Sequence, residues 1–411
     1  MRLFIFLFSI LILPLTRVQG EESLTLQRAI ELALKQNPEL EVSRQRVIAA
    51  DGRRIDIGKW SNPEFEVTVE EAPFDSGIDR GKTQAGLLQE FPFPGKKRLD
   101  REIGRAGVEI SSFNLLSARL TLIRDVKIAF YEALATERRH TIAKEILVLA
   151  KNSSDVVSKR LEAGRGSVQE QLRAEIETER SLAEVEDISQ QSISARQRLA
   201  VFIGDAASAS VPLSGNLPAY VNPSLVNPQN EFSDITQHPR IAVARVAIDQ
   251  ANLRLKRERL ERMPNLTAGF EAGRDGADDE SIFGLKFSLP LPLINRRRGA
   301  IQETSAKLKM AQSELSAVEL ALITQLRSNS QRYVAASRQV ATYRDRILPK
   351  SDEAVKLTDK GYGEGKFTLT DLLDTQRTTA AVRLIYQDKL LELLSAQAEI
   401  EALIDHANNS K

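Results

Sequence analysis

The 411-residue sequence contains no cysteine, only three histidines, and aromatic residues at just 5%. Without cysteine, disulfide bonds, thiolate metal sites, a cysteine nucleophile and a lipid-anchored amino-terminal cysteine are all excluded. His140, His238 and His406 are scattered along the chain, and no cluster of His or Met has the spacing of metal ligands. We therefore expect no metal site and no cofactor, and no motif favours an enzyme.

An excess of charge of one sign is also lacking. The 57 basic and 56 acidic residues leave a net charge of +1, which removes the positive field typical of a nucleic-acid binder. The many carboxylates are interpreted as i,i+4 partners of Lys and Arg on solvated helix faces. The segment Gly361–Lys366 has neither the spacing nor the Ser or Thr of a phosphate-binding loop.

Long hydrophobic runs are missing beyond the amino terminus. Arg2 precedes the apolar run 3–15, and Val18-Gln19-Gly20 ends it with a small residue, which is the layout of a secretory signal peptide over residues 1–20. An uncleaved anchor is the alternative, although about 13 apolar residues fall short of the roughly 20 that a spanning helix needs. No later stretch approaches that length, so we expect any membrane crossing to use strands.

The chain repeats itself at an offset of 201 positions. The matching segments are Asn37-Pro38 with His238-Pro239, Asn62-Pro63 with Met263-Pro264, and Gly164–Leu172 with Gly365–Leu373. Between them, Phe91-Pro92-Phe93-Pro94 matches Leu289-Pro290-Leu291-Pro292 at an offset of 198. We expect a first repeat at 21–203, an equatorial linker at 204–233, a second repeat at 234–405 and a tail at 406–411.

Each repeat contains two candidate strands, at about 63–72 and 83–92 and at about 264–273 and 281–291. Apolar and polar residues alternate along most of them, as in Phe65, Val67 and Val69, and about 9 to 10 residues suit a tilted transmembrane strand. A soluble hairpin with one face on a core is the alternative. Four strands cannot close a barrel in lipid, but three chains would supply 12. The basic triplets Lys96-Lys97-Arg98 and Arg296-Arg297-Arg298 are interpreted as clusters at the membrane boundary.

The remaining sequence predicts long helices. One runs from about 97 to 160 and is repeated from about 298 to 360, each about 95 Å long, and shorter helices are expected at about 37–59, 167–203 and 368–405. Apolar spacings of three, four and seven are typical of coiled coils. Two tight turns carry capping-box signals, Ser167 with Glu170 and Thr368 with Asp371. Glycines beside these turns permit positive φ angles: Gly164, Gly166, Gly363 and Gly365.

With this repeat, its proline-led strands and the segment Gly365–Asp374, the chain resembles the TolC-type family of outer-membrane efflux proteins over nearly all of its mature length. The segment Phe93–Arg98 is most similar to outer-membrane components of cobalt–zinc–cadmium-type cation efflux systems. The resemblance implies a mainly α protein with transmembrane β, whose trimer forms a 12-stranded β-barrel in the outer membrane and a periplasmic α-helical tunnel.

The implied function is passive exit of a substrate, with metal cations among the candidates, and not catalysis. The implied partners are two further copies of the chain, a periplasmic adaptor protein, a proton-driven inner-membrane pump and outer-membrane lipid. A periplasmic adaptor and a non-conducting scaffold protein are the alternative functions. Long helical hairpins are shared with adaptors, but alternating strands of membrane length argue against that class.

The resemblance also assigns roles at the turns. A latch closing the tunnel is implied at Tyr362, Glu170, Gln169 and Lys366, with Tyr362 to Glu170 as its main contact. Phe367 stands where the family often has an arginine. A ring of carboxylates at the narrowest point is implied at Asp371 and Asp374, which would favour cations and raise one another's pKa; a helix cap and a solvated face are the alternative roles. The implied adaptor-docking turns contain Gly164, Gly166, Val168, Gly365 and Leu369.

Overall fold

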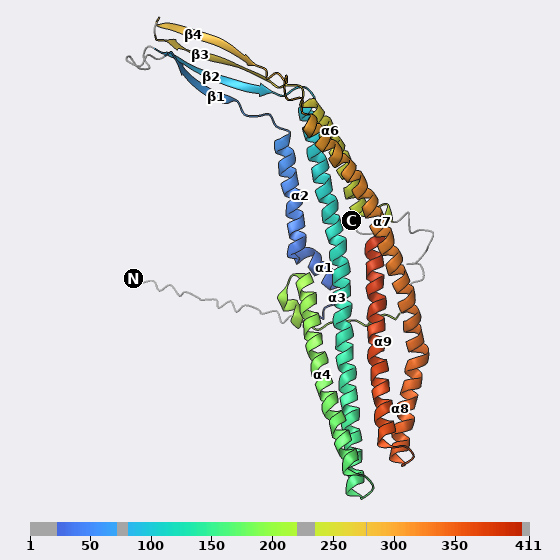
Figure 1. Cartoon of the computed structure of the whole chain (residues 1–411). Coiled ribbons are helices and arrows are strands. Elements are labelled where there is room, and N and C mark those ends of the chain that lie inside the picture. The colour runs from blue at the N-terminus through green and yellow to red at the C-terminus, as the bar shows by residue number, and fades with distance from the viewer. Residues whose placement is uncertain (1–22, 72–80, 220–234, 277, 405–411) are drawn as a thin grey trace, which may run out of the picture.

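A computed structural model describes residues 23–71, 81–219, 235–276 and 278–404. Figure 1 shows a long bundle of helices with a small sheet beyond one end and two helix-reversing turns at the other. This architecture confirms the predicted fold class of long helices with four strands. The predicted signal peptide, the tail and the linker beyond Ala219 lie outside the described residues.

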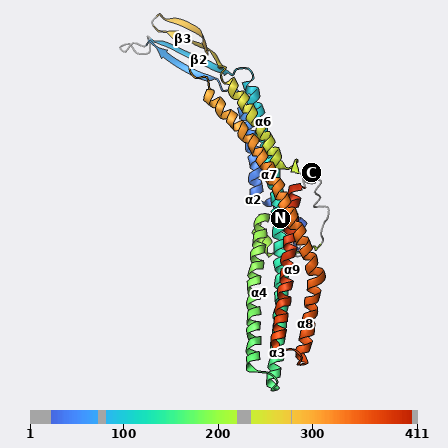
Figure 2. The same cartoon turned by 45° about the vertical axis from the view of Figure 1, so that its right-hand side comes forward.

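The first repeat consists of α1 (Leu26–Gln36), α2 (Pro38–Ile57), the long α3 (Lys96–Glu162) and α4 (Val168–Ile203). Asn37 caps α2, because its side-chain oxygen accepts from the amide of Leu40 at 2.9 Å. Its side-chain nitrogen donates to the carbonyl of Phe202 at 2.8 Å. Asn37 thus joins the start of α2 to the end of α4, and the two helices follow one another along α3 (Figures 1 and 2).

The second repeat consists of α6 (Pro239–Leu260), α7 (Arg298–Thr342), α8 (Leu348–Gly363) and α9 (Leu369–Ile404). The predicted single helix at 298–360 is interrupted here by η4, a π-helical turn at Tyr343–Ile347. Pro349 follows directly, and in a regular helix its ring would collide with the carbonyl of Asp345, four residues earlier. A wider π turn relieves that collision. At the equivalent position α3 has Val148, which is compatible with the uninterrupted helix seen there.

The four strands form one antiparallel sheet in the order β1 (Glu64–Glu70), β2 (Lys82–Phe91), β3 (Leu266–Asp275) and β4 (Glu280–Ser288). The pairing of β2 with β3 joins the two repeats. The register places one set of apolar side chains on a common face, and the large ones are exposed: Phe65, Val67, Val69, Leu87, Phe270, Phe283, Leu285 and Phe287.

The opposite face of the sheet is polar and concave. Glu66 on β1 accepts from Lys286 on β4 at 2.9 Å, although two strands separate them. Glycines at 86, 269 and 284 on this face leave room for that contact. The sheet therefore curls around its polar side and turns its apolar side outward.

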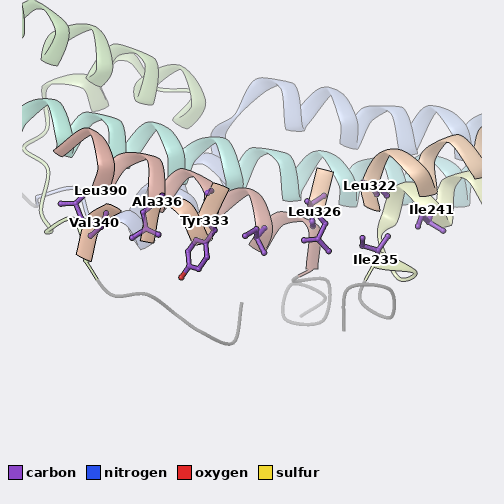
Figure 3. Close-up of a cluster of buried hydrophobic side chains, with 12 residues drawn as sticks. Ile235, Ile241, Leu322, Leu326, Tyr333, Ala336, Val340 and Leu390 are labelled. Carbon is purple, nitrogen blue, oxygen red and sulfur yellow. The ribbon is translucent and has the colours of Figure 1, made fainter. Parts of the chain in front are cut away.

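Buried side chains form separate clusters along the bundle. One, shown in Figure 3, lies where α6, α7 and α9 meet and includes Ile241, Leu322 and Leu390. A second lies among α1 to α4 around Phe130, and the start of the linker packs there: the amide of Leu24 donates to the carbonyl of Pro212 at 2.8 Å. No helix among the described residues is long and apolar enough to cross a membrane.

Candidate functional site at the helical tip

The two turns at the tip have the same backbone geometry, 201 positions apart. Gly164 and Gly365 have positive φ angles of 71° and 76°. The amide of the following residue then donates back into the helix: Arg165 to the carbonyl of Arg160, and Lys366 to that of Gly361, both at 2.8 Å. These are Schellman-type helix ends, for which glycine is the favoured residue. Of the predicted turn glycines, neither Gly166 nor Gly363 needs a positive φ.

The helices that follow both start with a capping box. Ser167 accepts from the amide of Glu170, whose carboxylate accepts from the amide of Ser167 at 3.0 Å. Thr368 and Asp371 make the equivalent pair, with the Asp371 carboxylate 2.9 Å from the Thr368 amide. Each carboxylate is therefore held within its own turn by its capping contact.

A small apolar cluster joins the two hairpins behind the turns. It contains Val157 of α3, Ala174 of α4, Tyr362 of α8, and three leucines of α9: Leu369, Leu372 and Leu373. Tyr362 is 3% exposed, and its hydroxyl has no hydrogen-bond partner among the described residues. Burial raises the pKa of this phenol; the Arg160 charge opposes that rise, and the nearby Glu170 charge adds to it.

Arg160, at the end of α3, holds Tyr362 from the first repeat. Its guanidinium donates to the carbonyl oxygen of Tyr362 at 2.9 Å and lies 4.8 Å from the centre of the Tyr362 ring. This combination of a charged hydrogen bond and a cation–π contact was missed by sequence reasoning, because an arginine in a last helical turn looks like an ordinary solvated residue.

The predicted latch residues are therefore arranged differently from the expectation. Within one chain the Tyr362 hydroxyl makes no hydrogen bond to Glu170, whose carboxylate accepts instead from the Ser167 amide of its own capping box. Lys366 pairs with Glu364 at 2.6 Å, within its own turn. Gln169 is exposed. Phe367 folds back over Gly361, where a methyl group would lie 2.2 Å from its ring.

The two predicted ring carboxylates are both exposed at the start of α9. Hydrogen bonds from the side chain and backbone of Thr368 lower the pKa of Asp371. The expected rise of this pKa would need neighbouring copies, and within one chain the capping contact determines its direction. Asp374 lies near Arg377, whose guanidinium pairs with the largely buried Glu177 of α4.

Further polar contacts continue along α9, away from the turns. Gln376 donates to Ser153 of α3 at 3.0 Å, and Arg383 pairs with Asp352 of α8 at 2.6 Å. Beside them, a cavity of about 210 Å³ opens between α3, α4 and α9. Beyond the small cluster at Tyr362, polar side chains supply much of the contact between the hairpins near the tip.

The predicted docking turns are exposed in part. Val168 is 63% exposed, and Gly164 and Gly365 lie at the outer surface. Leu369 is 3% exposed and packs into the tip cluster, so its side chain is not available to a partner. Among the residues that the structure describes, no group of three or more His, Asp or Glu side chains could hold a metal ion.

The sequence matches the outer membrane efflux protein family over residues 29–205 and 235–406, which are the two repeats. The chain belongs to this family. Two similar relatives are the cobalt-zinc-cadmium resistance protein CzcC of Cupriavidus metallidurans, 24% identical over 93% of this chain and 90% of that protein, and the nickel-cobalt-cadmium resistance protein NccC of Alcaligenes xylosoxydans, 24% identical over 81% and 74%.

Solved structures have the same fold. The outer-membrane channel OprN superposes with a TM-score of 0.79 at 19% identity, covering 92% of this chain and 89% of that one. A membrane protein from Pseudomonas aeruginosa gives 0.80 at 18% identity, covering 94% and 93%. Membership confirms the predicted family, and the protein is an outer-membrane efflux channel that extends into the periplasm. Its class is that of channels rather than enzymes.

Proposed function

We propose that three copies of this chain form the exit duct of a metal-cation efflux system, closed at rest by the helical tip. A periplasmic adaptor binds the exposed turns, and an inner-membrane pump supplies the substrate. The observation that carries the proposal is the sheet: its outer face is apolar and exposed, while its concave face is polar. Such a sheet suits lipid outside and water inside.

The open edges of the sheet support a trimer. Within the described residues, β1 and β4 each pair with one neighbour only. In lipid an unpaired strand edge costs several kcal/mol per group, so closure needs further strands. Pairing β4 of one copy with β1 of the next would close the sheet, and three copies would give the 12 strands expected above.

Charge supports cations as the substrate class. The register places seven carboxylates and two lysines on the polar face of one chain: Glu64, Glu66, Glu70, Glu90, Glu271, Asp275 and Glu280, with Lys82 and Lys286. A lumen lined in this way would concentrate cations. The names of CzcC and NccC link similar proteins to resistance against cobalt, zinc, nickel and cadmium.

The first test is the assembly and conductance of the mature protein. Light scattering in detergent, with the detergent subtracted, should give the mass of three chains. The same preparation should conduct ions across a planar bilayer. A monomeric mass would rule out a sheet that is shared between copies. A protein that assembles but conducts no ions would favour a non-conducting scaffold.

Removing the proposed ring charges should reduce cation selectivity. Asp371→Asn with Asp374→Asn keeps hydrogen-bonding groups of the same size, so the α9 cap survives while the charges are lost. We expect the reversal potential under a salt gradient to fall towards zero. Glu170→Gln is the matched control, because it occupies the Asp371 position of the first repeat. A ring at the start of α9 would be contradicted if the double variant and Glu170→Gln changed the reversal potential equally, or if neither changed it.

Loosening the Arg160 contact should open the tip. A cation–π contact contributes about 1 kcal/mol and a charged hydrogen bond about 1.5–3 kcal/mol, so Arg160→Gln should shift the closed-to-open equilibrium by about tenfold or more. Single-channel recording would show this as a longer open time. Tyr362→Phe keeps both the ring and the carbonyl that Arg160 contacts, so it should change little. A larger effect of Tyr362→Phe would indicate that another chain binds the phenol.

A further inference from the structure

The segment that follows β4 differs sharply from its counterpart in the first repeat. α3 begins at Lys96 directly after Pro94 and Gly95, whereas four additional residues, 293–296, separate Pro292 from Arg297 and the start of α7 at Arg298. Lys96 is 1% exposed, whereas Ile294 is 99% exposed. A buried lysine and a fully exposed isoleucine both reverse the usual preference of these residues. The four additional residues of the second repeat are all exposed.

The segment after β4 carries a run of exposed apolar side chains. Phe287 at the end of β4 is 68% exposed, and the exposure of the residues beyond it stays high: 50% for Leu289, 66% for Leu291 and 74% for Leu293. This surface continues the apolar outer face of the sheet towards the helices. Exposed apolar side chains gathered in this way mark a surface that contacts a partner or a membrane.

Hydrogen bonds fix the position of this loop. The amide of Leu293 donates to the carbonyl of Leu291 at 2.9 Å. The carbonyl of Arg296 accepts from Arg262 of the α6–β3 connection at 3.2 Å, and the Arg297 side chain donates to Glu258 of α6 at 2.6 Å. Arg297 also has a left-handed backbone, with φ of 54°. The loop is thus anchored at its carboxyl-terminal end, directly after its apolar residues.

The two arginines that flank Arg297 can bind a further partner. Arg296 and Arg298 are exposed, and neither guanidinium meets a carboxylate within the described part of the chain. They stand two and four positions after Ile294. Apolar side chains followed at once by unpaired arginines match the chemistry of a phospholipid, whose acyl chains adjoin an anionic phosphate.

We propose that the segment 289–298, which ends at the first residue of α7, is a phospholipid-binding anchor at the periplasmic boundary of the outer membrane. Leu293 and Ile294 enter the acyl region, and Arg296 and Arg298 bind headgroup phosphates. The proposal rests on the placement of the sheet in the outer membrane given above. It also gives a lipid-binding role to the basic triplet Arg296-Arg297-Arg298. The triplet Lys96-Lys97-Arg98 does not share this role, because Lys96 is buried and donates a hydrogen bond to Asn265.

Lipid binding to the full-length assembled protein tests this anchor. Delipidated protein in detergent is titrated with dioleoyl phosphatidylglycerol, and bound lipid is counted by native mass spectrometry. Each arginine near a membrane surface strengthens binding of an anionic headgroup, so Arg296→Gln with Arg298→Gln should weaken binding by about tenfold or more. Arg338→Gln with Arg346→Gln removes the same charge from exposed positions in α7 and η4 and should leave binding unchanged.

The apolar half of the anchor needs its own variant. Leu293→Ser with Ile294→Ser should weaken phosphatidylethanolamine as well as phosphatidylglycerol, since acyl contact does not depend on headgroup charge. Unchanged lipid binding in both double variants would overturn the proposal. Loss of the three-chain mass with lipid binding intact would also overturn it, because the loop would then be covered by a neighbouring copy.

The single tryptophan separates failure of the anchor from failure of the membrane placement. Trp60, 58% exposed, packs edge-on against Phe91 at the helical end of the sheet. In vesicles containing brominated acyl chains, its fluorescence should be quenched if this end of the sheet lies at the membrane boundary. Quenching without an effect of the loop variants rejects the anchor alone, and no quenching rejects the placement on which it rests.

Discussion

Gly273→Ala should prevent the two repeats from forming one sheet. A β-carbon at this position of β3 would lie 1.9 Å from the carbonyl oxygen of Thr83 on β2, a distance at which the strands must separate. Because β2 and β3 form the strand pairing that connects the repeats, their separation removes the continuous four-stranded surface. Overpacking costs about 1–3 kcal/mol where the backbone can relax, and here the neighbouring atom is itself backbone.

We expect assembled protein in the outer membrane to fall by about tenfold or more, which corresponds to at least about 1.4 kcal/mol. Quantitative immunoblotting of unheated membrane samples would measure it. Gly284→Ala is the matched control in β4, because its β-carbon would meet only the side chain of Glu271, which can rotate away. Equal assembly of both variants would show that the close approach of β2 and β3 is not required.

The internal repeat explains why so much of this fold could be predicted from sequence. Asn37 and His238 cap α2 and α6 before a proline, and Gly164 and Gly365 end α3 and α8 with the same hydrogen bonds. These features depend on residues close together in the chain, so local rules suffice. The strand alternation was equally readable, because each position faces either the polar or the apolar side.

Contacts between the repeats could not be predicted in the same way. Arg160 meets Tyr362 across 202 positions, and nothing near either residue signals the pair. Within one chain the Glu170 carboxylate is held by its own capping box and the Tyr362 phenol has no partner, so the Tyr362–Glu170 contact stays a prediction for the assembled protein. The break at η4 was missed: Pro349 was visible in the sequence, but the strength of the repeat suggested an unbroken helix.

Lys96→Ala should loosen the joint between the sheet and the helical bundle. The ammonium group of Lys96, the first residue of α3, donates to Asn265 at 2.8 Å and lies 3.4 Å from Glu261. Asn265 in turn donates to Glu90 of β2 at 2.7 Å, and Glu261 pairs with Arg257 of α6. The substitution removes one of the two cations that contact Glu261 and one of the two donors to the Asn265 oxygen. Breaking a buried pair costs about 3–5 kcal/mol where the remaining charge has no other partner.

Because Glu261 keeps Arg257 and some contact with water, we expect a smaller loss of about 1–3 kcal/mol, seen as a fall in the midpoint of thermal unfolding followed by circular dichroism. Lys97→Ala, at the adjacent and more exposed position, should leave the midpoint nearly unchanged. Lys96→Met with Glu261→Gln provides the deciding comparison. Removing both charges while keeping the volume should restore part of the loss, because part of the cost arises from a Glu261 carboxylate that has lost one of its two cations. A double variant as unstable as Lys96→Ala would instead assign the role of Lys96 to packing.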